Sequence, residues 1–264
     1  MTEEEMNTHR RIEEMSLNGW PALQTVHYDG WLLRLAEGYT KRSNSVSVLH
    51  QGAIRLEDKI AYCEQFYESR GQTPVFKITS FADGLRLDEQ LERRAYRKLD
   101  HTLVKSADLS RLAEPVLLQG FDYSLTPEPT EEWLKAIGGS GMQHLQSGQL
   151  ETKRRILAGI PLKKAFIMLR EGGKPVACGV AVMEAGWAGL YDIVTDRDCR
   201  GRGFGEQIMR LLLDWARREG ARQSYLLVVK SNAAANRLYD KFGFRELYDN
   251  WYRVKTTEEL QTPG

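Results

Sequence analysis

Cysteine, long apolar runs and an excess of either charge are all scarce in this chain, and each shortage excludes a class of protein. The three cysteines among the 264 residues are far apart and form no Cys-x-x-Cys or Cys/His pair, so we expect neither disulfides nor a structural metal site. The longest apolar stretches, such as Tyr225 to Val229, have the length of a strand, whereas a membrane-spanning helix needs roughly 20 residues. No segment is therefore expected to cross a membrane.

The chain also lacks a dominant charge and an export signal. With 37 basic and 36 acidic residues the formal net charge is +1, so composition gives no reason to expect a nucleic acid or an anionic membrane as partner. The first residues, Met1 to Met6, are acidic and contain no apolar signal core, which predicts a cytoplasmic location. An apolar fraction of 42% and a charged fraction of 28% are typical of a soluble, folded protein.

The length suits two domains of about 100–150 residues each. Prolines and threonines crowd residues 120–131, where neither helical nor strand periodicity is visible, and this predicts an interdomain connection. We therefore expect a first domain at 1–120, a linker at 121–130 and a second domain at 131–264. In the second domain, apolar spacing and turn residues predict helices at Glu131–Ile137, Gln149–Leu157, Glu206–Glu219 and Asn232–Phe242, and strands at Ala165–Arg170, Pro175–Glu184, Gly189–Thr195, Tyr225–Val229 and Trp251–Val254.

The first domain repeats the later part of the second. A shift of 149 residues places the predicted strand Val75–Ile78 on Ser224–Leu227. A helix at Leu87–Lys98 and a strand at Thr102–Val104 then match the last helix and strand of the second domain within a residue or two. This predicts two related folds, although helix–turn–strand units also recur by chance in α/β proteins.

One glycine-rich loop is a candidate binding motif. Residues 200–205 read Arg-Gly-Arg-Gly-Phe-Gly and connect a strand that ends at Thr195 to a helix that begins near Phe204. Glycines let the backbone approach a ligand closely, and exposed amides at a helix N-terminus favour phosphate oxygens. Arg200 and Arg202 would add charge-assisted hydrogen bonds. Because the spacing matches neither the dinucleotide-binding nor the Walker pattern, the loop predicts a phosphate-bearing ligand of another class.

The loop resembles the pyrophosphate loop of the GNAT superfamily of acetyltransferases, which has the form Arg/Gln-x-x-Gly-x-Gly/Ala. The matching residues, in the loop and in a second motif that follows it, are Arg200, Gly203, Gly205, Asn232, Ala235, Leu238, Tyr239, Gly243 and Phe244. The resemblance extends from about Phe166 to Val254. It implies an α/β (α+β) fold class with tandem GNAT-like folds, each a mixed, mostly antiparallel twisted sheet flanked by helices.

The whole chain looks like the bacterial two-domain GNAT proteins whose N-terminal domain is degenerate. The 149-residue shift places Gln51–Arg55 on the glycine-rich loop with a single glycine left, and it places Leu91 or a neighbour on Tyr239. The first domain is therefore expected to have lost the phosphate loop and the catalytic hydroxyl. In proteins of this type the acceptor site often lies between the halves.

The resemblance implies acetyl-CoA as the cofactor and assigns it a set of contacts. The backbone of Ile193, Val194 and Thr195 would pair with the pantetheine amides, and Asn232 would lie beside the cofactor arm. The pyrophosphate would be held by Arg200 and by the amides of Gly201, Arg202, Gly203, Phe204 and Gly205. No metal is required.

Two catalytic roles follow from the resemblance and from the chemistry of amide formation. Tyr239 would give a proton to the leaving thiolate, since a phenol has a pKa near 10 and a thiol one near 8.5; alternatively it is a packed helix tyrosine. A protonated amine needs a base or a water relay, and Asp192, on the strand face opposite Ile193, is the nearest candidate. Alternatively Asp192 only binds the substrate or an arginine. Cys199 would allow a covalent acyl-enzyme, but no histidine or acidic relay flanks it in a recognisable pattern.

The acceptor is less defined. The cluster Arg42-Ser43-Asn44-Ser45 predicts substrate contacts through Arg42 and Asn44, although such residues are also common in turns, and Glu184 is a further substrate-binding candidate. The leading hypothesis is an acetyl-CoA-dependent N-acetyltransferase in which a primary amine attacks directly in a ternary complex. A non-catalytic acyl-CoA-binding sensor is the alternative, and O- or S-acyl transfer stays open. The expected partner is a small-molecule or peptide amine, with no nucleic acid and no membrane, and we expect a monomer or homodimer.

Overall fold

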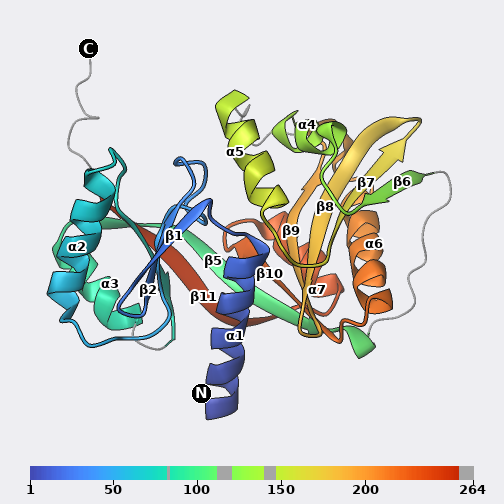
Figure 1. Ribbon diagram of the computed structural model, residues 1–264. Coiled ribbons are helices and arrows are strands. Elements are labelled where there is room, and N and C mark those ends of the chain that lie inside the picture. The colour runs from blue at the N-terminus through green and yellow to red at the C-terminus, as the bar shows by residue number, and fades with distance from the viewer. Residues whose placement is uncertain (82–83, 112–120, 140–146, 256–264) are drawn as a thin grey trace.

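The computed structural model describes residues 1–81, 84–111, 121–139 and 147–255, and its centre is one sheet of eleven strands (Figure 1). In chain order the strands are β1 (Gln24–Tyr28), β2 (Trp31–Leu35), β3 (Val46–Val48), β4 (Val75–Thr79), β5 (Tyr96–Asp108), β6 (Asp122–Thr126), β7 (Lys164–Glu171), β8 (Lys174–Glu184), β9 (Trp187–Thr195), β10 (Gln223–Val229) and β11 (Arg245–Lys255). The α-helices are α1 (Glu3–Gly19), α2 (Leu56–Glu68), α3 (Gly84–Arg93), α4 (Glu131–Gly139), α5 (Ser147–Ala158), α6 (Phe204–Arg218) and α7 (Ala233–Lys241).

The sheet has the predicted mixed, mostly antiparallel character. The pairs β3/β4 and β9/β10 are parallel, and the other neighbouring strands are antiparallel. Helix α6 packs on β7, β8 and β9, while α3 packs on β4 and β5. None of the described helices combines the length and apolar character that spanning a bilayer requires.

The internal repeat predicted from the sequence is present. Helix α3 begins at Gly84 and α7 at Ala233, while β5 begins at Tyr96 and β11 at Arg245, so both pairs of elements keep the 149-residue shift. The strand that precedes this helix is β4 in the first half and β10 in the second. Each has a parallel neighbour from its own half, β3 for β4 and β9 for β10. Two related α/β folds thus follow one another along the chain.

The two halves exchange their last strands. The order along the sheet is β1-β2-β3-β4-β11-β5-β10-β9-β8-β7-β6, so β11 pairs with β4 of the first half and β5 pairs with β10 of the second. The two exchanged strands also pair with each other over most of their length, and in Figure 1 they cross the middle of the molecule. Backbone hydrogen bonding therefore runs without a break from one half to the other.

Two predictions of local structure are corrected. The segment predicted as an irregular linker contains β6, which pairs with β7 at the sheet edge. Its side chains alternate between exposed and only half-buried, so it lacks the apolar pattern that identifies a strand. The helix predicted at Leu87–Lys98 ends at Arg93. Ala95, with φ of 61°, turns the chain, and the next residues continue as β5, which is long because it pairs on both sides.

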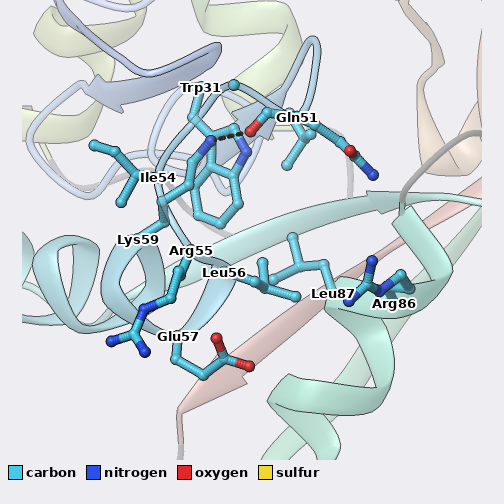
Figure 2. A pocket seen from close by; sticks show the side chains of 11 residues that line it. Trp31, Gln51, Ile54, Arg55, Leu56, Glu57, Lys59, Arg86 and Leu87 are labelled. Carbon is cyan, nitrogen blue, oxygen red and sulfur yellow. Dashed lines mark hydrogen bonds between the residues drawn. The ribbon is translucent and has the colours of Figure 1, made fainter.

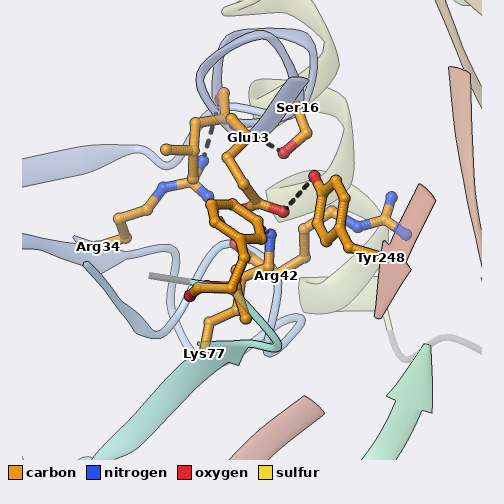
Figure 3. Close-up of polar contacts among 9 residues, drawn as sticks. Glu13, Ser16, Arg34, Arg42, Lys77 and Tyr248 are labelled. Atoms are coloured by element: carbon orange, nitrogen blue, oxygen red, sulfur yellow. Dashed lines mark hydrogen bonds and ion pairs between the residues drawn. The ribbon is translucent and has the colours of Figure 1, made fainter. Parts of the chain in front are cut away.

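Helix α1 was not predicted, and it packs across the junction of the exchanged strands. Its N-terminus carries a capping box in which Thr2 and Glu5 bond each other's backbone. Glu13 on its buried face forms an ion pair with Lys77 of β4 and accepts a hydrogen bond of 2.7 Å from the Tyr248 hydroxyl of β11 (Figure 3). A buried network thus holds α1 to strands of both halves.

Candidate active site

A cleft opens where β9 and β10 separate. The two strands pair only from Trp187 to Leu190 on β9, although β9 continues to Thr195. A bulge on β9 opposite β8, where Asp192 has φ of 48°, marks the point of separation. Ile193, Val194 and Thr195 have no β10 partner, although Val194 and Thr195 pair with β8 on their other side. The backbone groups that face away from β8 are thus available to an extended ligand, as the resemblance implies for pantetheine.

The glycine-rich loop has the geometry of an anion site. Gly201 and Gly203 have φ of 77° and 85°, and a Cβ at either would meet no atom within 4 Å. Within the described residues, the N–H groups of residues 201–205 donate to no acceptor. Gly203 begins α6 without a side-chain cap. Consecutive free amides at a helix N-terminus fit a pyrophosphate group.

The two arginines of the loop differ in their partners. Arg202 is paired with Glu171 at 2.6 Å, whereas Arg200 has no carboxylate partner in the described part of the chain. The Phe204 side chain is buried in the core against α6, so only its amide can contact a ligand. Arg200 is therefore the guanidinium with the freedom to bind a phosphate.

Helix α7 supplies the predicted proton donor. Tyr239 is buried beside Phe244, and burial raises the pKa of its hydroxyl to about 12, so the group is protonated at neutral pH. Its hydroxyl has no hydrogen-bond partner among the described residues. Asn232 caps α7 by accepting a hydrogen bond of 3.1 Å from the Ala235 amide. A buried, unbonded phenol suits both a proton donor and a packed tyrosine, so the catalytic role stays a prediction.

Asp192 has a partner that the sequence did not reveal. Its Oδ2 lies 2.7 Å from Nζ of Lys153 on α5, a side chain only 2% exposed. Lys153 also lies 5.5 Å from the centre of the Trp133 ring. One carboxylate oxygen is thus held by a buried ammonium, and Oδ1 is left for a ligand. The partner is a lysine rather than the arginine considered from sequence.

A pocket of about 430 Å³ adjoins the cleft. It is lined by the loop after β2 and by residues of β5, β9, β10 and β11, so both halves contribute. Asp192 of β9 and Leu227 and Val229 of β10 belong to this lining. The pocket therefore adjoins the cleft between β9 and β10 and lies between the two halves, where the resemblance leads us to expect the acceptor.

The three residues predicted to contact the substrate have different surroundings in the structure. Arg42 lines the pocket. The Asn44 amide bonds Ala36, Gly38 and Thr40 of its own loop through all four of its positions. Glu184 lies at the far end of β8 and accepts a hydrogen bond of 3.0 Å from Asn18. Neither residue belongs to the pocket lining, so substrate contact through Asn44 and Glu184 stays a prediction.

Sequence reasoning missed Arg34, which organises the pocket wall. This side chain is 2% exposed and donates to the carbonyls of Trp20 and Arg42 at 2.5 and 2.7 Å. A third hydrogen bond, to the Leu17 carbonyl, satisfies the end of α1. Burial lowers the pKa of this arginine to about 10. An arginine inside the apolar run of β2 was the signal in the sequence.

The first half fills its own version of the anion site. The Asp29 carboxylate accepts hydrogen bonds of 2.9 Å from the amides of Ala53 and Ile54 ahead of α2, and Lys59 pairs with it at 3.0 Å. Beside it lies a cavity of about 290 Å³ whose wall includes Trp31 and Lys59 (Figure 2). An internal carboxylate thus occupies amides that correspond to those of the glycine-rich loop.

Comparisons with known proteins agree with this arrangement. A family model described as "Probable histone acetyltransferase Rv0428c C-terminal" matches residues 7–253. The uncharacterized N-acetyltransferase YobR of Bacillus subtilis (strain 168) is 31% identical over 261 residues, which cover 95% of this chain and 100% of that protein. A GCN5-related N-acetyltransferase from Kribbella flavida has a TM-score of 0.70 at 15% identity, covering 95% of this chain and 96% of its own. A tandem GNAT protein from the clavulanic acid biosynthesis pathway has a TM-score of 0.62 at 12% identity, covering 81% and 76%. The two solved structures share the fold.

Proposed function

The chain belongs to the Rv0428c C-terminal family of GNAT-type acetyltransferases, and we propose that it transfers the acetyl group of acetyl-CoA to a primary amine bound between its two halves. In this proposal the halves are residues 1–120 and 131–264, joined by 121–130. The first half is degenerate as a cofactor site and supplies the loop that carries Arg42 to the acceptor pocket.

The observation that carries the proposal is the run of free amides from Gly201 to Gly205 at the N-terminus of α6. Five neighbouring donors without acceptors suit a diphosphate, because each would gain a charge-assisted hydrogen bond. The unpaired backbone of β9 leads from this loop toward Asp192. A long cofactor with a diphosphate at one end and amides along its arm fits this path.

The chain's own residues divide the work of the reaction. When bound, acetyl-CoA would supply an acetyl thioester, whose carbonyl carbon bonds to the amine nitrogen as the carbon–sulfur bond breaks. Asp192, through Oδ1, would bind the amine and accept its proton directly or through a water. Tyr239 would donate the proton that the sulfur needs, since its hydroxyl is protonated at neutral pH.

Calorimetric titration with acetyl-CoA tests the cofactor. Gly203→Ala should weaken binding at least about tenfold, because the new Cβ enters the space in front of the amides. Gly220→Ala, at the other end of α6, is the matched control: it also has positive φ and open surroundings, so it carries the same backbone strain and should bind normally. Equal affinity of both variants and the wild type would refute the loop assignment.

Thiol release with a panel of amines tests the reaction. Tyr239→Phe should bind acetyl-CoA normally and lose about 10²- to 10⁴-fold in turnover, which is the contribution that general acid catalysis typically makes. Unchanged turnover would remove Tyr239 from the mechanism. Tight acetyl-CoA binding without thiol release for any acceptor would instead favour the acyl-CoA sensor.

A further inference from the structure

We propose that the acceptor carries a carboxylate near its amine and that Arg42 binds this carboxylate in the pocket between the halves. The inference rests on the proposed function and narrows its substrate class to amino acids and compounds with the same pair of groups. Three observations carry it: an unpaired and preoriented cation, two buried donors without partners, and the balance of charge in the pocket.

The Arg42 guanidinium is held by rings rather than by a carboxylate. Its Cζ lies 5.2 Å from the centre of the Trp20 ring and 5.8 Å from that of Tyr191. Arg34 fixes the backbone of both Arg42 and Trp20. Within the described chain no acidic side chain pairs with Arg42. Its hydrogen-bonding edge is thus prepared for an anion, with little side-chain entropy left to lose.

Two other pocket residues have buried donors without partners. Nδ2 of Asn250, a residue 1% exposed, and Nε1 of Trp20 are both buried and make no hydrogen bond in the described structure. Asn250 lies on β11 where the exchanged strands meet, opposite Thr102. A buried donor without an acceptor is costly. An oxygen-rich group bound beside Arg42 would give these donors the acceptor that they lack.

The charges of the pocket favour a ligand group with a single negative charge. Lys41 is already paired with Asp100 at 3.0 Å, and Asp192 is paired with Lys153. Arg42 is therefore the one described pocket cation without a partner. A carboxylate balances it, whereas a doubly charged phosphate would leave a negative charge facing the carboxylates of Asp100 and Asp192.

Asp192 provides the site for the amine. It lines the same pocket as Arg42 and stands at the β9 bulge where the cleft opens, so an amine bound to it is next to the expected thioester, while the carboxylate of the same molecule binds Arg42. The pocket thus recognises two groups of opposite charge, an amine and a carboxylate, on one small molecule. A plain alkylamine would leave Arg42 and Asn250 without partners.

Acetyl transfer to matched acceptors tests the inference. The panel contains the standard amino acids, their carboxamides, the amines formed by removing the carboxylate, and phosphoethanolamine, and thiol release gives kcat and KM. For at least one amino acid, kcat/KM should be at least about tenfold higher than for its carboxamide and for its decarboxylated amine. Both of these compounds lack the carboxylate and therefore lose the charge-assisted hydrogen bond.

Two variants assign the carboxylate to its residues. Arg42→Gln and the near-isosteric Asn250→Asp should each raise KM for that amino acid at least about tenfold. Both should leave the acetyl-CoA affinity unchanged and raise KM for the carboxamide several-fold less than KM for the amino acid, because the carboxamide lacks the negative charge that Arg42 binds. Arg70→Gln, whose guanidinium packs on Phe66 in the first half, is the control. Thermal melting confirms that all variants are folded.

The outcomes separate the inference from the proposed function. Equal use of amino acids and carboxamides, equal loss for both in Arg42→Gln, or preference for phosphoethanolamine would overturn the carboxylate assignment and leave N-acetyl transfer standing. If the protein binds acetyl-CoA but releases no thiol with any amine of the panel, both the proposed function and the inference are overturned.

Discussion

The ion pair between Asp192 and Lys153 leads to a specific prediction, because a substitution of Asp192 should change both the stability of the protein and its turnover. Replacing Asp192 by asparagine removes the negative charge and keeps the shape. Asparagine is also the right choice for the backbone, since φ is 48° there and asparagine tolerates this left-handed conformation better than alanine. The substitution leaves the Lys153 ammonium buried without a counter-charge.

The expected destabilisation is large. Removing one partner of a buried ion pair costs about 3–5 kcal/mol, and the lower end applies because the Asp192 side chain is 22% exposed, against 2% for Lys153. About 3 kcal/mol changes the unfolding equilibrium by roughly two powers of ten at about 1.4 kcal/mol per tenfold. It should lower Tm by about 6–12 °C in a chain of this size. Calorimetry measures both quantities.

The double variant Asp192→Asn/Lys153→Met is the control. It removes both charges and leaves an apolar side chain of similar length beside Trp133, so most of the lost stability should return. With stability restored, turnover reports the role of Asp192 alone. If Asp192 is the base, its loss should lower kcat by about 10²- to 10⁴-fold. If Asp192 only binds the substrate, its loss should raise KM instead.

The reasoning would be refuted by two results. A single variant as stable as the wild type would show that the pair is not a buried ion pair in solution. A double variant less stable than the single one would show that Lys153 contributes through contacts other than its charge.

Two further predictions concern stability. Glu13→Gln leaves Lys77 buried without a counter-charge and should cost about 3 kcal/mol, measured by urea denaturation; a loss under about 1 kcal/mol would contradict the network in Figure 3. The amides of Ala53 and Ile54 and the Lys59 ammonium lower the pKa of Asp29 from 3.8 to about 2. Stability from Asp29 is therefore complete above about pH 4 and lost as the pH falls toward 2. Asp29→Asn should flatten this part of the pH profile, and an unchanged profile would refute the assignment.

Sequence predicted the parts of the site whose signal is local. The glycine-rich loop, α6 and Tyr239 follow from residues that are neighbours or lie one or two helical turns apart, so spacing alone carries the information. The 149-residue repeat was also visible, because corresponding elements such as α3 and α7 or β5 and β11 start at the same spacing in both halves. Fold class, the loop and its helix were therefore predictable.

Contacts between distant segments were not predictable. Nothing near Asp192 indicates that Lys153 reaches it, and nothing near Asn250 indicates that the exchange of β5 and β11 places it in the pocket between the halves. The protein partners of Asn44 and Glu184 were hidden for the same reason: the sequence does not show that Asn44 bonds Ala36 or that Glu184 bonds Asn18.

The exchange of last strands also sets the order in which the protein can fold during synthesis. Strand β4 leaves the ribosome long before its neighbour β11, which follows about 170 residues later in the chain. Until then β4 and β5 each have an open edge, and such edges invite pairing with other chains. The first half cannot complete its sheet on its own, so a truncated product should be prone to aggregation. The pocket between the halves, whose wall includes Asn250 and Tyr252 of β11, is therefore completed late in synthesis.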